Sequence, residues 1–263
     1  MAVRDHELHK NLFMKWCDRV CPGASRMNPA SDPQKQALLF GGGTNRNIKT
    51  NDPMPPERIF KVPNIDGIIE EGKKKPLKNT NLIIKGLGLN PVKHTSAGWP
   101  AVSAEVLREL AGKNPTDVAE PMYGTAYAAL GGGQNGREAC IALDSLCAMN
   151  SIDTMIANFI KPLQSLSDDQ GRVHCSLNLN TETGRLSSRR PNLQNQPALE
   201  KDKYKIRDAF RASKGKTLIV ADYGQLELRL LGKEKKKRKI LLIPSKRQHD
   251  YKSFVVTEEY CCW

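Results

Sequence analysis

The chain has 263 residues, of which 39% are hydrophobic and 26% are charged, so it is long enough to form one large domain or two small ones with a proper core. No apolar run approaches the roughly 20 residues of a membrane-spanning helix, which argues against a membrane protein. The formal net charge of +13 and the pI near 9.4 favour a polyanionic partner, a basic tail, or both.

The cysteines and the N-terminus bear on the cellular compartment. The seven cysteines match neither the spacing of a zinc site nor that of a disulfide framework, and their number is odd, so a reducing compartment is expected. Residues 1–20 contain Asp5, Glu7 and Asp18 and lack an apolar core. They therefore have the character of neither a secretory signal nor a transit peptide, and the true N-terminus stays open.

The N-terminal third begins with helical patterns and then loses them. Residues 6–20 carry four apolar side chains at helical spacing and predict a short amphipathic helix. These side chains are Leu8, Leu12, Phe13 and Trp16. Residues 27–40 predict a loop and a second helix. From residue 41 to about 90, glycine and proline clusters such as GGGTN and PMPP interrupt short apolar pieces. This composition predicts an exposed, partly disordered insertion.

Two further helical regions follow. Residues 95–111 combine a turn, Ser103 as N-cap, an apolar face and the terminating Gly112, which together predict a helix. A glycine cluster at residues 131–136 separates two more helices. The second of them has the clearest helical repeat in the chain, for which core packing is the expected role. This apolar stripe consists of Ile152, Met155, Ile156, Phe159, Ile160 and Leu163.

Residues 173–180 alternate between apolar and polar side chains, which predicts a half-buried strand with its polar face outward. The apolar positions are Val173, Cys175, Leu177 and Leu179. The strand leads into a segment dense in hydroxyl, amide and guanidinium groups, which suits a surface that hydrogen-bonds phosphates and minor-groove acceptors. A polar loop rich in turn formers is the alternative. The polar residues are Thr181, Thr183, Arg185, Ser187, Ser188, Asn192, Gln194 and Asn195.

The next segments combine a basic stretch with a strand that ends on a carboxylate. Residues 201–210 form a basic amphipathic segment that offers Lys203, Lys205 and Arg207 to phosphates; a solvated face is the alternative. Residues 217–221 are a short apolar run typical of a buried strand, which ends on Asp222 before a helical pattern begins. A carboxylate there is placed to hold Mg²⁺ or to cap the helix.

Two long motifs carry a family resemblance. TETGRLSSRRPNLQNQP (residues 181–197) and ADYGQLELRLL (residues 221–231) resemble the palm of the DNA polymerase I family, the A-family DNA polymerases, and in particular its plant organellar branch. The motifs occur in the family's order and at its spacing, so the match is specific. The resemblance extends weakly back to about Met27 and stops after Leu231.

The resemblance implies roles for individual residues. Asp222 is implied as a catalytic metal-binding aspartate, with the Tyr223 carbonyl as a second Mg²⁺ ligand, and Glu227 as the steric gate against ribonucleotides. Contacts to primer-template DNA are implied for Arg185, Asn192, Gln194 and Asn195. Arg185 is expected to reach the minor groove at the primer terminus. Deoxynucleoside triphosphates are the implied substrates of the complete enzyme.

The sequence departs from the family pattern at two places within the motifs. Gly224 replaces a common serine without loss of a side-chain ligand. Ala198 and Leu199 stand where family members often carry an arginine, which puts one DNA contact in doubt.

The resemblance also implies a domain organisation. Its fold class is α+β, with a helical thumb and a partial antiparallel palm, and with the fingers and the upstream exonuclease domain absent from this chain. The expected segments are N-terminal helices (1–40), an exposed insertion (41–92), a thumb-like helical region (93–170), a partial palm (171–231) and a divergent basic tail (232–263). An incomplete palm sheet is expected to expose apolar side chains and to promote aggregation.

Three interpretations follow from this pattern. The chain is a fragment of a DNA-directed DNA polymerase that acts in plastid or mitochondrial replication and repair, a module that binds primer-template without extending it, or a degenerate product. The family's second catalytic carboxylate does not follow Leu231, and two-metal phosphoryl transfer needs it. The chain by itself is therefore expected to lack polymerase activity.

Overall fold

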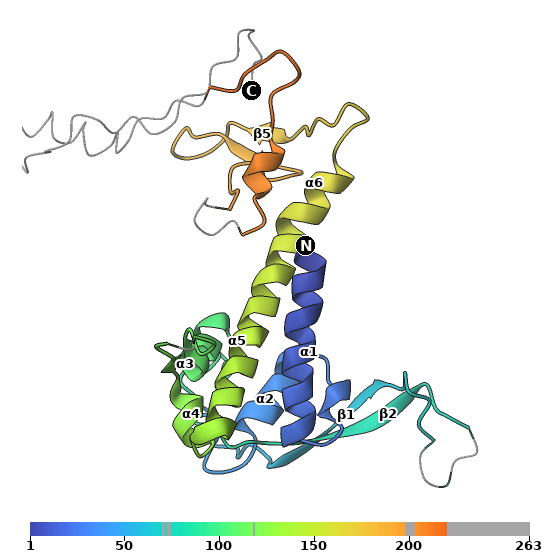
Figure 1. Cartoon of the computed structure of the whole chain (residues 1–263), viewed down its shortest axis with the longest axis vertical. Helices are drawn as coiled ribbons and strands as arrows, with labels where there is room; N and C mark the ends of the chain where they lie inside the picture. Colours follow the sequence, from blue (N-terminus) through green and yellow to red (C-terminus); the bar gives the residue numbers. More distant parts are fainter. Residues whose placement is uncertain (70–71, 73–74, 118, 198–202, 220–263) are drawn as a thin grey trace, which may run out of the picture. The chain divides into compact units, whose positions relative to one another are not determined.

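The computed structural model describes residues 1–69, 72, 75–117, 119–197 and 203–219 (Figure 1). The chain divides into two compact units, Met1–Leu193 and Gln194–Trp263, which are described separately below. The division falls inside the segment 171–231 that was expected to form the partial palm. Residues 220–263, which include the second sequence motif, lie outside the described part of the chain.

The first unit combines helices with small antiparallel sheets, so the predicted mixed α+β class is confirmed for the described residues. The helices are α1 (Ala2–Val20), η1 (Ala24–Arg26), α2 (Asp32–Phe40), α3 (Ala104–Ala111), α4 (Thr125–Ala129), α5 (Gly133–Met155), η2 (Ile156–Ile160) and α6 (Lys161–Ser165). The strands pair as β1 (Glu57–Pro63) with β2 (Asn79–Lys85), β3 (Gly112–Lys113) with β4 (Met122–Tyr123), and β5 (Ser176–Asn178) with β6 (Ser187–Arg189).

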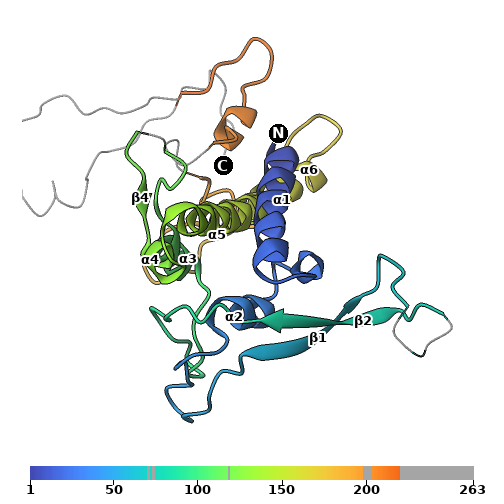
Figure 2. The ribbon, with the colours of Figure 1, turned by 60° about the horizontal axis from the view of Figure 1, so that its bottom comes forward.

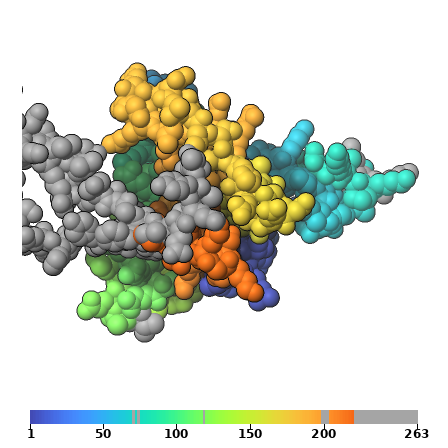
Figure 3. Space-filling view, turned by 90° about the horizontal axis from the view of Figure 1, so that it is seen from above, coloured from blue at the N-terminus to red at the C-terminus, as the bar shows by residue number. Residues whose placement is uncertain are grey.

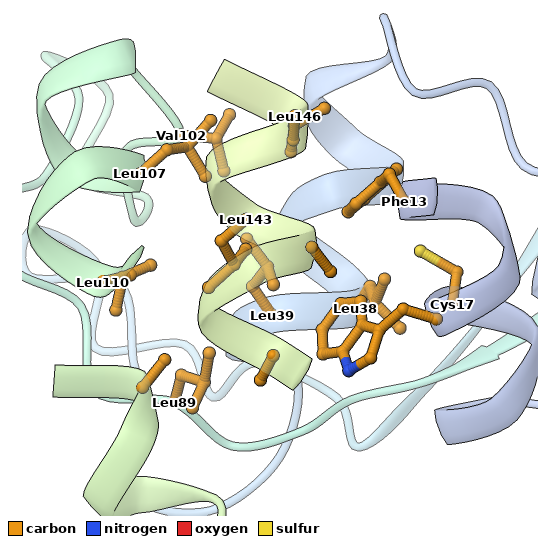
Figure 4. Packing of buried hydrophobic residues seen from close by; sticks show 14 of the residues in the cluster. Phe13, Cys17, Leu38, Leu39, Leu89, Val102, Leu107, Leu110, Leu143 and Leu146 are labelled. Carbon is orange, nitrogen blue, oxygen red and sulfur yellow. The ribbon is translucent and has the colours of Figure 1, made fainter. Parts of the chain in front are cut away.

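Helix α5 is the centre of the core. Figure 4 shows Leu143 and Leu146 of α5 between Phe13 of α1 on one side and Leu107 of α3 on the other, and all four side chains are fully buried. Burial of a leucine of this kind stabilises the fold by about 2–5 kcal/mol relative to alanine. The helix pair α1–α5 and the short helix α3 therefore form the main hydrophobic contact of the unit.

Helices α1 and α5 run antiparallel. His6, near the start of α1, lies 3.1 Å (Nε2 to Oδ1) from Asp153 near the end of α5, whereas Arg19 at the other end of α1 pairs with Glu138. The predicted helix over residues 6–20 is present and begins earlier, and its buried face includes two of the four predicted apolar side chains. Phe13, Trp16 and Cys17 are buried, whereas Leu8 and Leu12 are exposed.

Residues 57–85 correct the expectation of an exposed insertion. Strands β1 and β2 form a regular hairpin in which Ile59 faces Ile83 and Phe60 faces Leu82. Alternate residues of β2 are buried, among them Leu82 and Ile84, whereas Ile83 is 49% exposed. One face of the hairpin therefore belongs to the core. The alternation of apolar and polar residues in β2 is visible in the sequence. The glycine and proline clusters around it favoured a loop and led to the wrong prediction.

The hairpin is attached to α2 through its backbone. Figure 2 shows α2 beside the hairpin, and the N–H groups of Leu87 and Leu89 donate to the carbonyls of Leu38 and Leu39 at 2.8 and 2.9 Å. At the crossing, a Cβ on Gly86 would lie 2.1 Å from the carbonyl oxygen of Gly41. Only glycine permits this close approach of two backbones.

The segment Gly133–Ser165 is one long helical stretch interrupted by the π-helical turn η2. By length and composition it could cross a membrane, but half of its apolar window is buried inside the protein, where α5 packs against α1, α3 and α4. The predicted core stripe is confirmed at Ile152, which is buried. Farther along the same stripe, Met155, Phe159 and Leu163 are only half-buried.

Candidate nucleic-acid interface

The hairpin β5–β6 carries the first half of the polar motif. Ser176 pairs with Arg189 and Asn178 with Ser187. Between the strands, the Thr181 hydroxyl donates to the carbonyl of Arg185 at 2.5 Å, and the N–H of Gly184 donates to the carbonyl of Thr181 at 3.1 Å. The loop is thereby closed on itself, and the Arg185 side chain lies exposed beyond it.

The apolar face predicted for residues 173–180 is not buried in the structure. The strand is limited to Ser176–Asn178, and Leu177 and Leu179 are 45% and 73% exposed. Leu186, at the other side of the loop, is also exposed. Figure 3 shows the yellow segment that follows α6 at the surface of the molecule. The predicted half-buried strand is therefore wrong for residues 176–180, because alternation does not say whether another element covers the apolar face.

Ser188 organises the turn that follows β6. Its side chain is buried, its hydroxyl donates to the carbonyl of Pro191 at 3.2 Å, and it accepts a hydrogen bond from the N–H of Leu193 at 3.1 Å. The turn between these residues presents Asn192 with an exposed side chain. Ser188 therefore shapes the motif from within, whereas the sequence suggested a surface hydroxyl that faces DNA.

A second ordered turn precedes the hairpin. Asp168 accepts hydrogen bonds from the N–H groups of Gln170 and Arg172 at 3.0 and 2.7 Å, and its other oxygen lies 3.0 Å from Nε2 of His174. The Arg172 N–H bond, followed by the His174 contact, holds the pKa of the Asp168 carboxyl below its usual value. Residue spacing alone does not predict this cluster, because it depends on a turn that brings His174 back to Asp168.

In the second unit, the described residues include five that were expected to contact DNA. Gln194, Asn195, Lys203 and Lys205 are exposed. The Arg207 side chain is also exposed, but it bonds the backbone. Its Nε donates to the carbonyl of Pro197 at 2.7 Å, and its Nη2 donates to the carbonyl of Gln196 at 3.2 Å. Sequence reasoning offered Arg207 to phosphates and did not anticipate these partners.

Asp222, Tyr223 and Glu227 lie outside the described residues, so their expected roles in metal binding and nucleotide selection remain predictions. The same applies to Ala198 and Leu199. Within residues 1–69, 72, 75–117, 119–197 and 203–219, no group of three or more His, Cys, Asp and Glu side chains could hold a metal ion.

Comparisons with known proteins place the chain in a family. The model of DNA polymerase family A matches residues 74–250, which is more than half of the 263 residues. This match continues beyond Leu231, so the expectation that the resemblance stops there is wrong. The polymerase domain of Pol1 from M. smegmatis, solved with a DNA primer-template and dNTP, gives a TM-score of 0.49 at 21% identity and covers 88% of this chain and 29% of that one.

Two plant relatives are much more similar in sequence. The chain is 47% identical to DNA polymerase I A, chloroplastic/mitochondrial, of Arabidopsis thaliana and 51% identical to DNA polymerase I A, chloroplastic, of Oryza sativa subsp. japonica. Each alignment covers 88% of this chain and 25% of the relative, so the chain spans about a quarter of the length of these proteins. The predicted resemblance to the plant organellar branch is confirmed, and the chain belongs to DNA polymerase family A.

Proposed function

We propose that this chain is part of a DNA-directed DNA polymerase, which transfers deoxynucleotides to the 3′ end of a DNA primer in replication and repair. Membership of the family and the names of the plant relatives support the proposal. Those names also favour a plastid or a mitochondrion as the location. For residues 93–231 we keep the assignment that the resemblance implies, with a thumb in residues 93–170 and part of the palm in residues 171–231.

In this proposal, the described residues bind primer-template DNA. The loop of the β5–β6 hairpin and the turn after β6 expose Arg185 and Asn192 next to Arg189 and Arg190. Guanidinium groups fit phosphates and minor-groove acceptors, and amides hydrogen-bond base edges and sugars. The observation that carries the proposal is that Ser188 and Thr181 hold this polar segment by hydrogen bonds within the segment itself.

The residues of the second motif complete the active site in this proposal. Asp222 and the Tyr223 carbonyl would hold Mg²⁺, since hard cations take oxygen ligands, and Glu227 would exclude the 2′-hydroxyl of a ribonucleotide. When bound, the metal ions supply charge stabilisation to phosphoryl transfer. In a protein that extends primers, Asp222→Ala is expected to abolish extension, and Glu227→Ala is expected to admit ribonucleotides.

A binding assay tests the proposed DNA contact. The affinity of the 263-residue chain for a labelled primer-template is measured over a range of KCl concentrations. Affinity should fall steeply with salt, because phosphate contacts release counterions. Arg185→Ala should weaken binding by about 5- to 150-fold, as expected for loss of a groove contact. Arg4→Ala removes the same charge from the exposed start of α1 and should have little effect. Equal losses in the two variants would contradict the proposal.

A further inference from the structure

Arg207 makes two hydrogen bonds to consecutive backbone carbonyls of the motif. Its Nε donates to Pro197 at 2.7 Å and its Nη2 donates to Gln196 at 3.2 Å. The three residues belong to the same compact unit. The contact spans ten and eleven residues of sequence, so it joins the end of the QNQP segment to the short helix η4 (Ile206–Ala209).

The carbonyls of Gln196 and Pro197 lie outside helices and strands, so no backbone ladder pairs them. Backbone carbonyls outside helices and strands are paired by side chains or by water. A guanidinium group meets this need well, because its charged N–H groups are fixed in one plane and can bond two neighbouring acceptors at once. The single ammonium of lysine cannot reproduce that geometry.

The base of the Arg207 side chain is itself fixed. The preceding Ile206 is only 5% exposed. Lys205, at the N-cap of η4, has a left-handed backbone with φ of 52°, and the N–H groups of Asp208 and Phe210 bond the carbonyls of Lys205 and Arg207 at 3.1 Å each. The guanidinium group therefore extends from an ordered turn and can fix the backbone that it contacts.

We propose that Arg207 is a positioning residue, which holds the backbone of residues 194–197 so that Gln194 and Asn195 contact duplex DNA, and that it is not a phosphate ligand. This inference rests on the proposed function, because it assigns a purpose to the segment that Arg207 braces. It also distinguishes Arg207 from Lys205, which is exposed on the same turn and keeps its expected phosphate contact.

Two substitutions separate positioning from phosphate binding. Arg207→Lys keeps the positive charge but loses the planar pair of N–H donors, whereas Arg207→Ala loses both. If Arg207 positions the segment, each variant should bind primer-template about tenfold more weakly than the unaltered chain, with an unchanged slope of affinity against salt. If Arg207→Lys restores affinity and Arg207→Ala lowers the salt slope by about 0.9, Arg207 is a phosphate ligand and the proposal is overturned.

The two hydrogen bonds from Arg207 to the carbonyls of Gln196 and Pro197 form a brace on this backbone. Hydrogen–deuterium exchange without DNA tests the brace independently of the proposed function. Amides of residues 194–196 should exchange faster in both Arg207 variants than in the unaltered chain. Arg211→Lys is the matched control, since Arg211 Nε donates to the nearby carbonyl of Asp208 at 3.0 Å, which lies outside residues 194–197. Unchanged exchange in both Arg207 variants would overturn the brace even if duplex binding is observed. Faster exchange in a chain that does not bind duplex would retain the brace and refute its role in binding.

Discussion

The Ser188 hydroxyl accepts a hydrogen bond from the backbone N–H of Leu193 at 3.1 Å, across the turn that contains Asn192. The same motif thus contains a buried side chain, Ser188, and an exposed one, Asn192. The polar residues of the segment have two kinds of role. Some shape its backbone, whereas others remain exposed on the surface that we propose contacts DNA.

Ser188→Ala is expected to loosen this turn. The Leu193 N–H and the Pro191 carbonyl lose their partner, at a cost of about 1–3 kcal/mol to the local structure, and duplex binding through Asn192 should weaken with it. Faster amide exchange at Leu193 and a lower primer-template affinity would be the result. Ser187→Ala, on the neighbouring half-buried residue, is the control, and an equal effect of the two variants would contradict the account.

Two adjacent isoleucines of β2 that differ in burial test the buried face of the β1–β2 hairpin. Ile84 is fully buried and its neighbour Ile83 is 49% exposed. Ile84→Ala is expected to lower the free energy of unfolding by about 2–5 kcal/mol, whereas Ile83→Ala should change it by under about 1 kcal/mol. Urea unfolding measures both values. Similar losses would show that the two faces of β2 are not distinguished in solution.

The Asp168 turn predicts an effect of acid. Its folded pKa lies below the usual value of 3.8 because of the Arg172 N–H and then the His174 side chain. The charged form is the one held in the fold, so its contribution is present above pH 3.8 and is lost as the pH falls through the folded pKa. A carboxyl ¹³C titration should give a midpoint below 3.8 for Asp168, and His174→Ala should raise it. A midpoint at or above 3.8 in the unaltered chain would contradict the described contacts.

Buried thiols should resist alkylation. Burial, and then the charge of Asp144, raises the pKa of Cys147 to about 11, and burial also raises the pKa of Cys140. At pH 8 little reactive thiolate is present at either position. Iodoacetamide labelling, read by mass spectrometry of peptides, should modify the half-buried Cys175 before these two thiols, which should react only after unfolding. Early labelling of Cys147 would indicate that α5 is not packed as described.

Local patterns predicted some elements well. Helix α3 begins after Ser103 and ends at Ala111, directly before Gly112, whose φ is 92°, and Val106, Leu107 and Leu110 are buried as expected. The helical repeat and the glycine with a positive φ act within a few residues, so the sequence contains the necessary information. The Ser103 side chain, however, makes no capping hydrogen bond.

Other features depend on how distant segments meet. The burial of Ile84 and the exposure of Leu177 follow from which element covers each strand, and alternation cannot supply that. The backbone contacts of Ser188 and Arg207 depend on the path of a loop, which residue types alone do not determine. The family itself was predictable, because its motifs are long and specific.

Photocrosslinking from the primer terminus tests the central claim most directly. A primer-template with a photoreactive nucleotide at the primer 3′ end is bound to the 263-residue chain and irradiated, and the crosslinked peptides are identified by mass spectrometry. The account predicts crosslinks in residues 181–197, reduced in Arg185→Ala. Crosslinks confined to α1 or to the β1–β2 hairpin, with none in residues 181–197, would contradict it.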